Sequence, residues 1–175
     1  LTTSALCEPY PSDEQMDIIY KAALRAPDHA WLRPSRFLQV TGDGLDKLSK
    51  IFYQYAKENM GDISEDKLIK YKKAPFRAPM IIILITNVTN HPSVPEHEQM
   101  FSTAAAAQNI LLALHAFKFG GIWRTGKFAM NKDIEKSLGL ASNQKILGFL
   151  YVGTPCGKVK KIPEIKTDDF VSKLQ

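Results

Sequence analysis

Hydrophobic residues recur at helical spacing directly after a helix-start signal near the beginning of the chain. Ser12 and Gln15 have the S-x-x-Q spacing of a capping box, in which two side chains satisfy the first free backbone N–H groups of a helix. This signal predicts an amphipathic helix over residues 13–24, ending before Pro27, because a residue that precedes proline avoids the helical conformation. The apolar positions of this helix are Met16, Ile19, Tyr20 and Ala23.

Two continuous apolar segments, residues 80–86 and 145–153, have the composition of buried strands. The first is almost entirely isoleucine and leucine, and such an uninterrupted strand is typically buried on both faces of its sheet. Residues 37–41 predict a further short strand.

The longest predicted helix covers residues 97–118 and is apolar nearly all the way round, including the four alanines Ala104–Ala107. A helix that is apolar on every side is buried, and its alanines would let a neighbour or a cofactor approach closely. His115 lies within this helix and is expected to be a hydrogen-bonded core residue. Gly120 and Gly121 are predicted to end the helix.

Shorter helices are predicted for residues 44–58, 64–73 and 130–138, and residues 155–175 are predicted to form an extended tail. The chain has no internal repeat and no linker that would divide it. We therefore predict an α+β fold in a single domain of residues 1–175. Its small central sheet, mixed or antiparallel, would be flanked by helices on both faces, with the long helix buried at the centre.

Length and charge restrict the partners that this chain can have. A domain of 175 residues buries about 70% of the surface of its unfolded chain, which forms a core but leaves little room to enclose a large cofactor. The net charge is +5, and the basic residues are scattered rather than gathered in the stripe typical of nucleic-acid modules. We expect no nucleic-acid partner; the charge fits a solvated surface or an attraction for anionic ligands.

The two cysteines, Cys7 and Cys156, are too few for a disulfide framework and too far apart for a CxxC motif. They are expected to be reduced thiols in the cytoplasm. No signal-peptide pattern is present, and the longest apolar runs fall far short of the ~20 residues of a membrane span. A cytoplasmic location without membrane association is predicted.

The sequence lacks the motifs of several common enzyme classes. The four histidines, His29, His91, His97 and His115, show no HExxH or Cys/His spacing, so no metal site is predicted. There is no GxSxG nucleophile elbow and no GxxxxGK[ST] phosphate loop. GxGxxG is also absent, so a Rossmann dinucleotide fold is not expected.

Two short segments remain as candidate ligand sites. Arg25-Ala-Pro-Asp-His29 places Arg, Asp and His on a stiffened loop; it is either an ordinary helix end with an Asp turn, or a set of donors for a planar, electron-rich ligand. Phe119-Gly-Gly-Ile-Trp-Arg-Thr-Gly126 is either a helix stop followed by a strand, or a glycine-lined approach with an aromatic wall at Trp123 and a cation at Arg124. The residues alone leave both alternatives open.

Five segments in order along residues 2–155 resemble the flavin-dependent NAD(P)H nitroreductase family, and most closely its small YdjA-type subgroup. They are Arg25-Ala-Pro-Asp-His29, Lys73-Ala-Pro-Phe-Arg-Ala-Pro79, Glu98-Gln99, Gly120-Gly-Ile-Trp-Arg-Thr-Gly126 and Gly148-Phe-Leu-Tyr-Val-Gly-Thr-Pro155. The resemblance implies a nitroreductase-like fold, a homodimer, and one tightly bound FMN at each of two sites between the subunits.

The resemblance also implies which residues contact the ligands. FMN would be bound by Thr2, Arg25, His29, Trp123, Arg124 and Thr125. Thr2 matches the serine of the family's Arg-Arg-Ser phosphate-binding stretch, whereas Leu1 stands at its second arginine. Losing those arginines should weaken phosphate binding unless another cation replaces them. The stretch matched to NAD(P) contacts is Ala113, Leu114, His115, Ala116, Phe117 and Lys118, of which Lys118 is the obvious phosphate partner.

The implied reaction is ping-pong: NAD(P)H passes hydride to flavin N5, leaves, and is replaced by an electron-poor acceptor such as a nitroaromatic or a quinone. The flavin carries the chemistry, so no residue is expected as a general acid, and Arg25 could stabilise charge on the reduced ring. The alternative is a non-catalytic flavin-binding protein that carries FMN as cargo.

Overall fold

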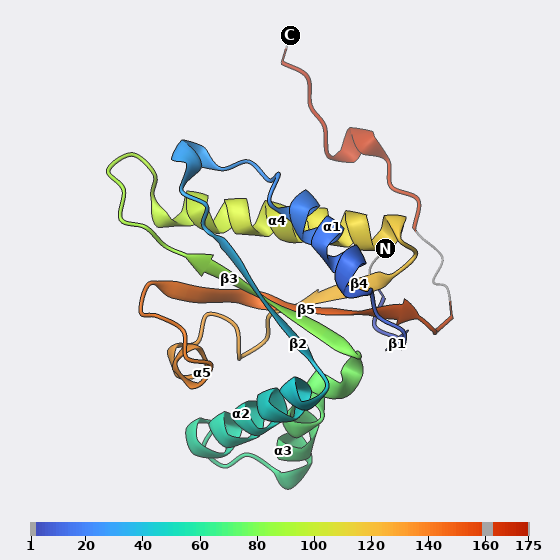
Figure 1. Ribbon diagram of the computed structural model, residues 1–175, viewed down its shortest axis with the longest axis vertical. Coiled ribbons are helices and arrows are strands. Elements are labelled where there is room, and N and C mark those ends of the chain that lie inside the picture. The colour runs from blue at the N-terminus through green and yellow to red at the C-terminus, as the bar shows by residue number, and fades with distance from the viewer. Residues whose placement is uncertain (1–2, 159–162, 175) are drawn as a thin grey trace.

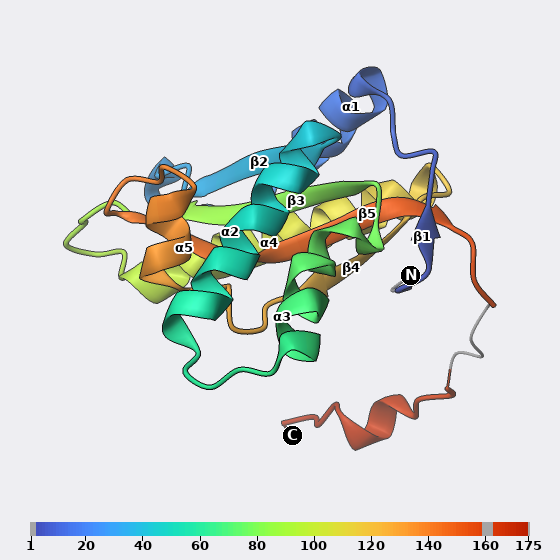
Figure 2. The same cartoon turned by 90° about the horizontal axis from the view of Figure 1, so that it is seen from below.

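An antiparallel sheet lies between two helical layers in the computed structural model, which describes residues 3–158 and 163–174 (Figures 1 and 2). The strands are β1 (Leu6–Cys7), β2 (Ser35–Thr41), β3 (Met80–Asn87), β4 (Gly120–Arg124) and β5 (Gln144–Pro155). The α-helices are α1 (Asp13–Ala23), α2 (Asp43–Asn59), α3 (Glu65–Lys72), α4 (Glu96–Ala116) and α5 (Lys132–Ser137). Short 3-10 turns are η1 (His29–Trp31), η2 (Ala74–Arg77) and η3 (Thr167–Asp169). The predicted α+β class, with helices on both faces, is confirmed.

The sheet is organised around β5, which pairs with three other strands. Its order is β1-β5-β3-β2, and β4 pairs with β5 from Gly120 opposite Gly153 to Arg124 opposite Phe149. The strand pairs of the described residues are all antiparallel, so the sheet is antiparallel rather than mixed.

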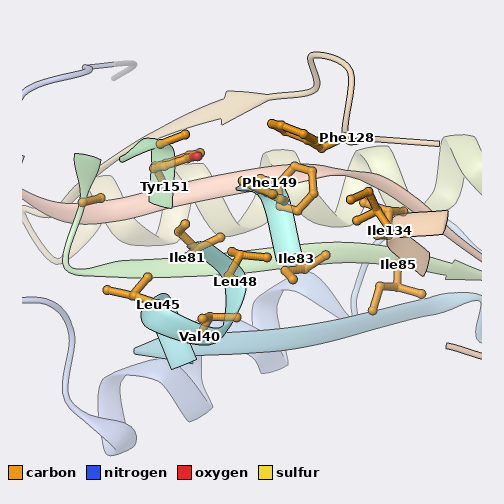
Figure 3. Packing of buried hydrophobic residues seen from close by; sticks show 14 of the residues in the cluster. Val40, Leu45, Leu48, Ile81, Ile83, Ile85, Phe128, Ile134, Phe149 and Tyr151 are labelled. Atoms are coloured by element: carbon orange, nitrogen blue, oxygen red, sulfur yellow. The ribbon is translucent and has the colours of Figure 1, made fainter. Parts of the chain in front are cut away.

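Strand β3 is buried on both faces, as predicted, and its alternation divides the core in two. Met80, Ile82 and Leu84 pack with α1 and α4. The intervening Ile81, Ile83 and Ile85 pack with α2 and α5, as Figure 3 shows. Because side chains alternate across a strand, one apolar segment supplies both cores. The sheet is antiparallel, yet helices cover both of its faces.

Helix α1 begins and ends where the sequence predicts. The Ser12 hydroxyl accepts a hydrogen bond from the Gln15 backbone N–H, and the Gln15 side chain accepts one from the Ser12 backbone N–H, which completes the capping box. Met16, Ile19 and Ala23 are its buried residues.

Two expectations about α4 are wrong. The helix ends at Ala116 with Phe117 as its cap, and the left-handed residue that follows is Lys118 (φ 66°), not a glycine. Gly120 and Gly121 instead lie in β4, where a Cβ at Gly121 would approach Leu111 Cδ2 to 3.0 Å. Gly121 serves close packing between α4 and the sheet, and Gly120 packs against Pro155 and the N-terminal segment, so neither ends the helix.

Helix α4 is also not buried all round in this chain. Ala106, Ala107, Ile110 and Leu114 are fully buried, but Phe101 and Leu112 are 66% and 59% exposed. His115 is exposed as well, which contradicts the core position predicted for it. The apolar composition of α4 exceeds what one face of a single sheet can cover.

The two cysteines form a disulfide, so the expectation of free thiols is contradicted. Strand β1, which no sequence pattern predicted, pairs Cys7 with Thr154 near the end of β5. This pairing brings the Cα atoms of Cys7 and Cys156 to 6.0 Å, within the range of disulfides. The bond joins residues 149 positions apart, a separation from which proximity could not be inferred.

The C-terminal tail begins later than predicted, because β5 continues through Pro155 to pair with β1. After Cys156, the described tail residues are all exposed, and among them only Thr167–Asp169 form a helical turn, η3.

Candidate functional site

The loop after α1 carries Arg25 and His29 and is held against the first half of α4. Both residues are exposed, and His29 Nδ1 lies 2.8 Å from Glu98 Oε2. One helical turn further along α4, the Ser102 hydroxyl donates a hydrogen bond to the Pro27 carbonyl at 2.6 Å. Helix α4 therefore fixes the position of this loop through two polar contacts.

The same loop has an unusual backbone. Ala30, Trp31 and Arg33 all have positive φ values, between 51° and 57°. The Asp28 carboxylate accepts a hydrogen bond from the Arg33 backbone N–H at 3.0 Å and forms an ion pair with its guanidinium. The Asp turn predicted here is therefore present. Non-glycine residues with positive φ are strained, and such strain is concentrated at functional sites in proteins.

The side chain of Trp123, near the end of β4, occupies space that is free only because residue 148 is a glycine. A Cβ at Gly148 of β5 would lie 2.0 Å from Trp123 Nε1. That nitrogen is buried and has no hydrogen-bond partner within the described part of the chain. Buried donors are rarely left unpaired, so Trp123 is a candidate for contact with a ligand or another chain.

Arg124 projects from the opposite face of the same strand. Its guanidinium carbon lies 5.7 Å from the ring centroid of Tyr151, and its Nε is also buried and unpartnered among the described residues. Burial raises the pKa of the Tyr151 hydroxyl, and the charges of Arg77 and Arg124 partly oppose that shift. Tyr151, Arg77 and Arg124 line the same pocket. Thr125 follows, exposed.

A pocket of about 460 Å³ opens beside this strand end, between β4, β5 and the α2–η2 region; we call it the β4 pocket. Its walls contain five aromatic rings in addition to Trp123: Phe52, Tyr71, Phe128, Phe149 and Tyr151. Its positively charged residues are Lys70, Arg77, Arg124 and Lys127, and none of its lining residues is acidic. Figure 3 shows Tyr151, Phe149 and Phe128 among the side chains of the core layer behind this pocket.

The structure does not bring the two predicted groups of flavin contacts into one pocket of this chain. Arg25 lines a separate hollow of about 380 Å³ with Leu24, Ala26, Asp28, Trp31 and Arg33. Trp123, Arg124 and Thr125 line the β4 pocket. The two groups of predicted contacts therefore lie in separate pockets of one chain.

The stretch proposed to contact NAD(P) is only partly accessible. Leu114 is fully buried among core residues, so it is not available to a nucleotide. Ala113 and Phe117 are partly buried, whereas His115, Ala116 and Lys118 are exposed. Thr2, the residue matched to the phosphate-binding serine, lies outside the described residues.

The structure adds residues that the sequence patterns did not single out. Glu98 was noted only as half of a Glu-Gln landmark, and here it contacts His29. Its neighbour Gln99 is buried and binds both backbone groups of Thr89, at 2.8 and 2.9 Å. Arg77 and Tyr151 enter the β4 pocket from η2 and β5. The Glu98-Gln99 pair at the start of a helix could have indicated polar contacts, but the sequence does not show that Glu98 would contact His29, 69 residues away.

No group of three or more His, Cys, Asp or Glu side chains among residues 3–158 and 163–174 is arranged to hold a metal ion. No described helix is long and apolar enough to cross a membrane.

Comparison with known families decides the assignment. The model of the nitroreductase family matches residues 6–154. The chain belongs to the nitroreductase family. It is 38% identical over 155 residues to YdjA of Escherichia coli K12, provisionally named an NAD(P)H nitroreductase, covering 88% of this chain and 83% of that protein. A Haemophilus influenzae protein with the same provisional name is 32% identical over 171 residues, covering 97% and 92%.

Solved structures share the fold of this nitroreductase-family chain. A nitroreductase-like family protein from Bacillus cereus superimposes with a TM-score of 0.83 at 18% identity, covering 99% of this chain and 91% of that one. A variant of the FMN- and NADPH-dependent nitroreductase NfnB from Sphigopyxis superimposes with a TM-score of 0.76 at 16% identity, covering 98% and 94%. At these identities the likeness concerns the fold.

Proposed function

We propose that this protein is an FMN-dependent oxidoreductase that takes hydride from NAD(P)H and reduces an electron-poor acceptor such as a nitroaromatic or a quinone. The observation that carries the proposal is the end of β4, where Trp123 Nε1 and Arg124 Nε are buried and have no hydrogen-bond partner among residues 3–158 and 163–174. Family membership and the FMN- and NADPH-dependence named for NfnB support the choice of ligands.

The residues present fit a flavin. A flavin offers a planar ring with carbonyl oxygens and a phosphate, and this chain offers unpaired donors, an aromatic wall and excess positive charge. Gly148 leaves room for the Trp123 indole and so fixes the position of that aromatic side chain at the end of β4. These features match a planar, anionic ligand better than a neutral aliphatic one.

Bound FMN would supply the redox chemistry by accepting hydride from NAD(P)H and passing the electrons to the acceptor in a ping-pong sequence. The chain's own residues would bind the flavin and orient it. Arg25 places a fixed positive charge on the loop held by α4, and His29, oriented by Glu98, offers its other ring nitrogen. Trp123, Arg124 and Thr125 provide the opposing half-site.

A homodimer would unite the two half-sites, Arg25 and His29 of one chain facing Trp123–Thr125 of another. The exposed apolar side chains of α4, Phe101 and Leu112, support such an assembly, because large apolar groups on a helix surface favour burial against a partner. We also propose a cytoplasmic location, where NAD(P)H is available.

The decisive test is the visible spectrum of the purified protein before and after addition of NADH or NADPH under anaerobic conditions. We expect a flavin absorbance that bleaches on reduction and returns when a nitroaromatic or quinone is added. A yellow protein that neither nucleotide bleaches would instead identify a non-catalytic flavin carrier. A colourless protein that fails to bind added FMN would refute the proposal.

A further inference from the structure

We propose that the disulfide between Cys7 and Cys156 is a redox switch that sets how tightly the protein holds FMN. While the bond is intact, residues 3–9, the N-terminal segment, stay on the sheet. Once a dithiol reduces the bond, this segment detaches and FMN binding weakens. The inference rests on the proposed function and adds a means of regulating the same flavin site.

The bond is accessible to a reductant. Both cysteines are exposed, at the rim of the sheet where β1 meets the end of β5 (Figure 2). A thiolate of an external dithiol attacks one sulfur, the other sulfur leaves and takes a proton, and the second thiol of the reductant then closes its own disulfide. The protein thereby gains the two electrons and two protons that the dithiol loses. Exposed disulfides exchange in this way more readily than buried structural ones.

The cysteine content of the chain suits a reversible bond. Cys7 and Cys156 are its only cysteines, so no other disulfide can form within the chain. The proposed function places the protein in the cytoplasm, where thiol reductants keep most cysteines reduced. Disulfides that do form there are usually transient and often sense the redox state. An exposed bond between the only two cysteines meets that description.

The N-terminal segment has few attachments besides the disulfide. Its strand, β1, is two residues long, and Leu6 is its one buried residue. The Thr3 backbone N–H donates a hydrogen bond to the Gly121 carbonyl at 3.3 Å. The Ala5 carbonyl accepts one from the Cys156 N–H at 3.1 Å. Because segments with little buried apolar surface open locally at low cost in free energy, the crosslink contributes much of what keeps this segment in place.

The same segment packs directly on β4, the strand that carries proposed flavin contacts. A Cβ at Gly120, the first residue of β4, would lie 2.9 Å from Thr3 Cγ2 and 2.9 Å from Pro155 Cγ. Among the described strands β4 pairs with β5 alone, so its position depends on such lateral contacts. Trp123 and Arg124 lie at its other end. Detachment of the segment would therefore loosen β4 and, with it, the two unpaired donors proposed to meet the flavin.

The test is the dissociation constant of FMN, measured by fluorescence titration of the full chain in two redox states. A thiol assay on the denatured protein verifies each state: no free thiol before treatment with a dithiol, and both cysteines free afterwards. We expect the dissociation constant to be about tenfold higher in the reduced protein, a change of about 1.4 kcal/mol in the free energy of binding. Reoxidation should restore the lower value.

Two variants separate the bond from the residues around it. The double variant Cys7→Ser/Cys156→Ser should bind FMN as weakly as the reduced wild type, with or without the dithiol. Ser4→Ala is the matched control, because it changes an exposed residue of the same segment and keeps the bond. This control should bind FMN as the wild type does and keep the full response to the dithiol.

Hydrogen exchange distinguishes local detachment from general unfolding, and it needs no turnover. Reduction should speed amide exchange in residues 3–9 and 120–124. Exchange in β3 should not change, because that strand lies in the core on both faces of the sheet.

Equal dissociation constants in the two redox states would overturn the inference. Faster exchange across the whole sheet would also overturn it, by showing that reduction unfolds the protein rather than releasing one segment. Two free thiols in the wild type before any reductant would show that there is no bond to switch. Protein that binds FMN in neither state contradicts the proposed function itself.

Discussion

The indole of Trp123 fills the space above Gly148, and a single methyl group at position 148 would lie 2.0 Å from its Nε1. The two residues come from adjacent strands, since Trp123 pairs with Leu150 of β5. Glycine at 148 is therefore a steric requirement of the tryptophan position. Any ligand contact that Trp123 makes therefore depends on the absence of a side chain at position 148.

Gly148→Ala should displace the indole and weaken FMN binding by about tenfold or more, while lowering stability by about 1–3 kcal/mol through overpacking. FMN titration and thermal unfolding would measure the two effects. In the Gly148→Ala background, Trp123→Phe should recover part of the lost stability, because the smaller ring needs less of the occupied space. An unchanged melting temperature in Gly148→Ala would contradict the steric relationship.

Arg25→Ala should lower FMN retention or the rate of flavin reduction by about tenfold, because it removes a fixed positive charge from the loop. Flavin content after gel filtration and stopped-flow reduction by NAD(P)H would measure both quantities. Lys21→Ala is the matched control, since Lys21 is an exposed cation one turn earlier that pairs with Asp17. Identical flavin content and reduction rate in Arg25→Ala and wild type would refute the role of Arg25.

Glu98→Gln should weaken FMN binding by a few-fold, because the anionic partner that orients His29 at 2.8 Å would be replaced by a neutral one. Fluorescence titration of FMN would give the dissociation constants. Glu96→Gln alters the other acidic residue in the first turn of α4, which forms an ion pair with Lys145 rather than with the loop after α1. Equal effects of the two substitutions would show that helix charge, rather than the contact with His29, is responsible.

Cys7→Ser should lower the free energy of unfolding by about 2–4 kcal/mol, because it removes a crosslink that closes a long loop. Thermal or denaturant unfolding with and without a dithiol reductant would test this. The reductant should destabilise the wild type and leave Cys7→Ser unaffected. A count of two free thiols in the unreduced, denatured wild-type protein would show that the bond is not formed in solution.

Stability should fall as the pH rises above about 10, because burial raises the pKa of both Tyr20 and Tyr151. Unfolded tyrosines lose their protons near pH 10, whereas these folded ones retain them, so above that pH the unfolded state binds fewer protons. Below pH 10 both states are neutral at these positions and the contribution is constant. Denaturant unfolding at pH 8 and pH 10.5 would measure the loss.

Tyr20→Phe should reduce that alkaline loss and cost about 1 kcal/mol at pH 8, because the Tyr20 hydroxyl donates a hydrogen bond to Gln39 Oε1 at 2.9 Å. Tyr10→Phe, at an exposed residue near the N-terminus, is the control and should leave the pH dependence unchanged. The same alkaline slope in Tyr20→Phe and wild type would contradict the assignment to Tyr20.

Local patterns in the sequence determined most of the elements, though not β1, and pointed to the family. The capping box at Ser12 placed the start of α1, and the apolar run at 80–86 predicted a strand buried on both faces. These features depend on hydrogen bonds and periodicities within a few residues, which the sequence displays directly. The ordered landmarks from Arg25 to Pro155 carried the nitroreductase resemblance that the family comparison confirmed.

Tertiary structure alone decided which distant residues meet. Strand pairing opposed β1 to the end of β5 and so joined Cys7 to Cys156, and it placed Trp123 against Gly148. It also put Arg25 and Arg124 in separate pockets of one chain. The physical reason is that register and sheet face depend on contacts between segments far apart in sequence, where a shift by one residue would send each side chain to the opposite face.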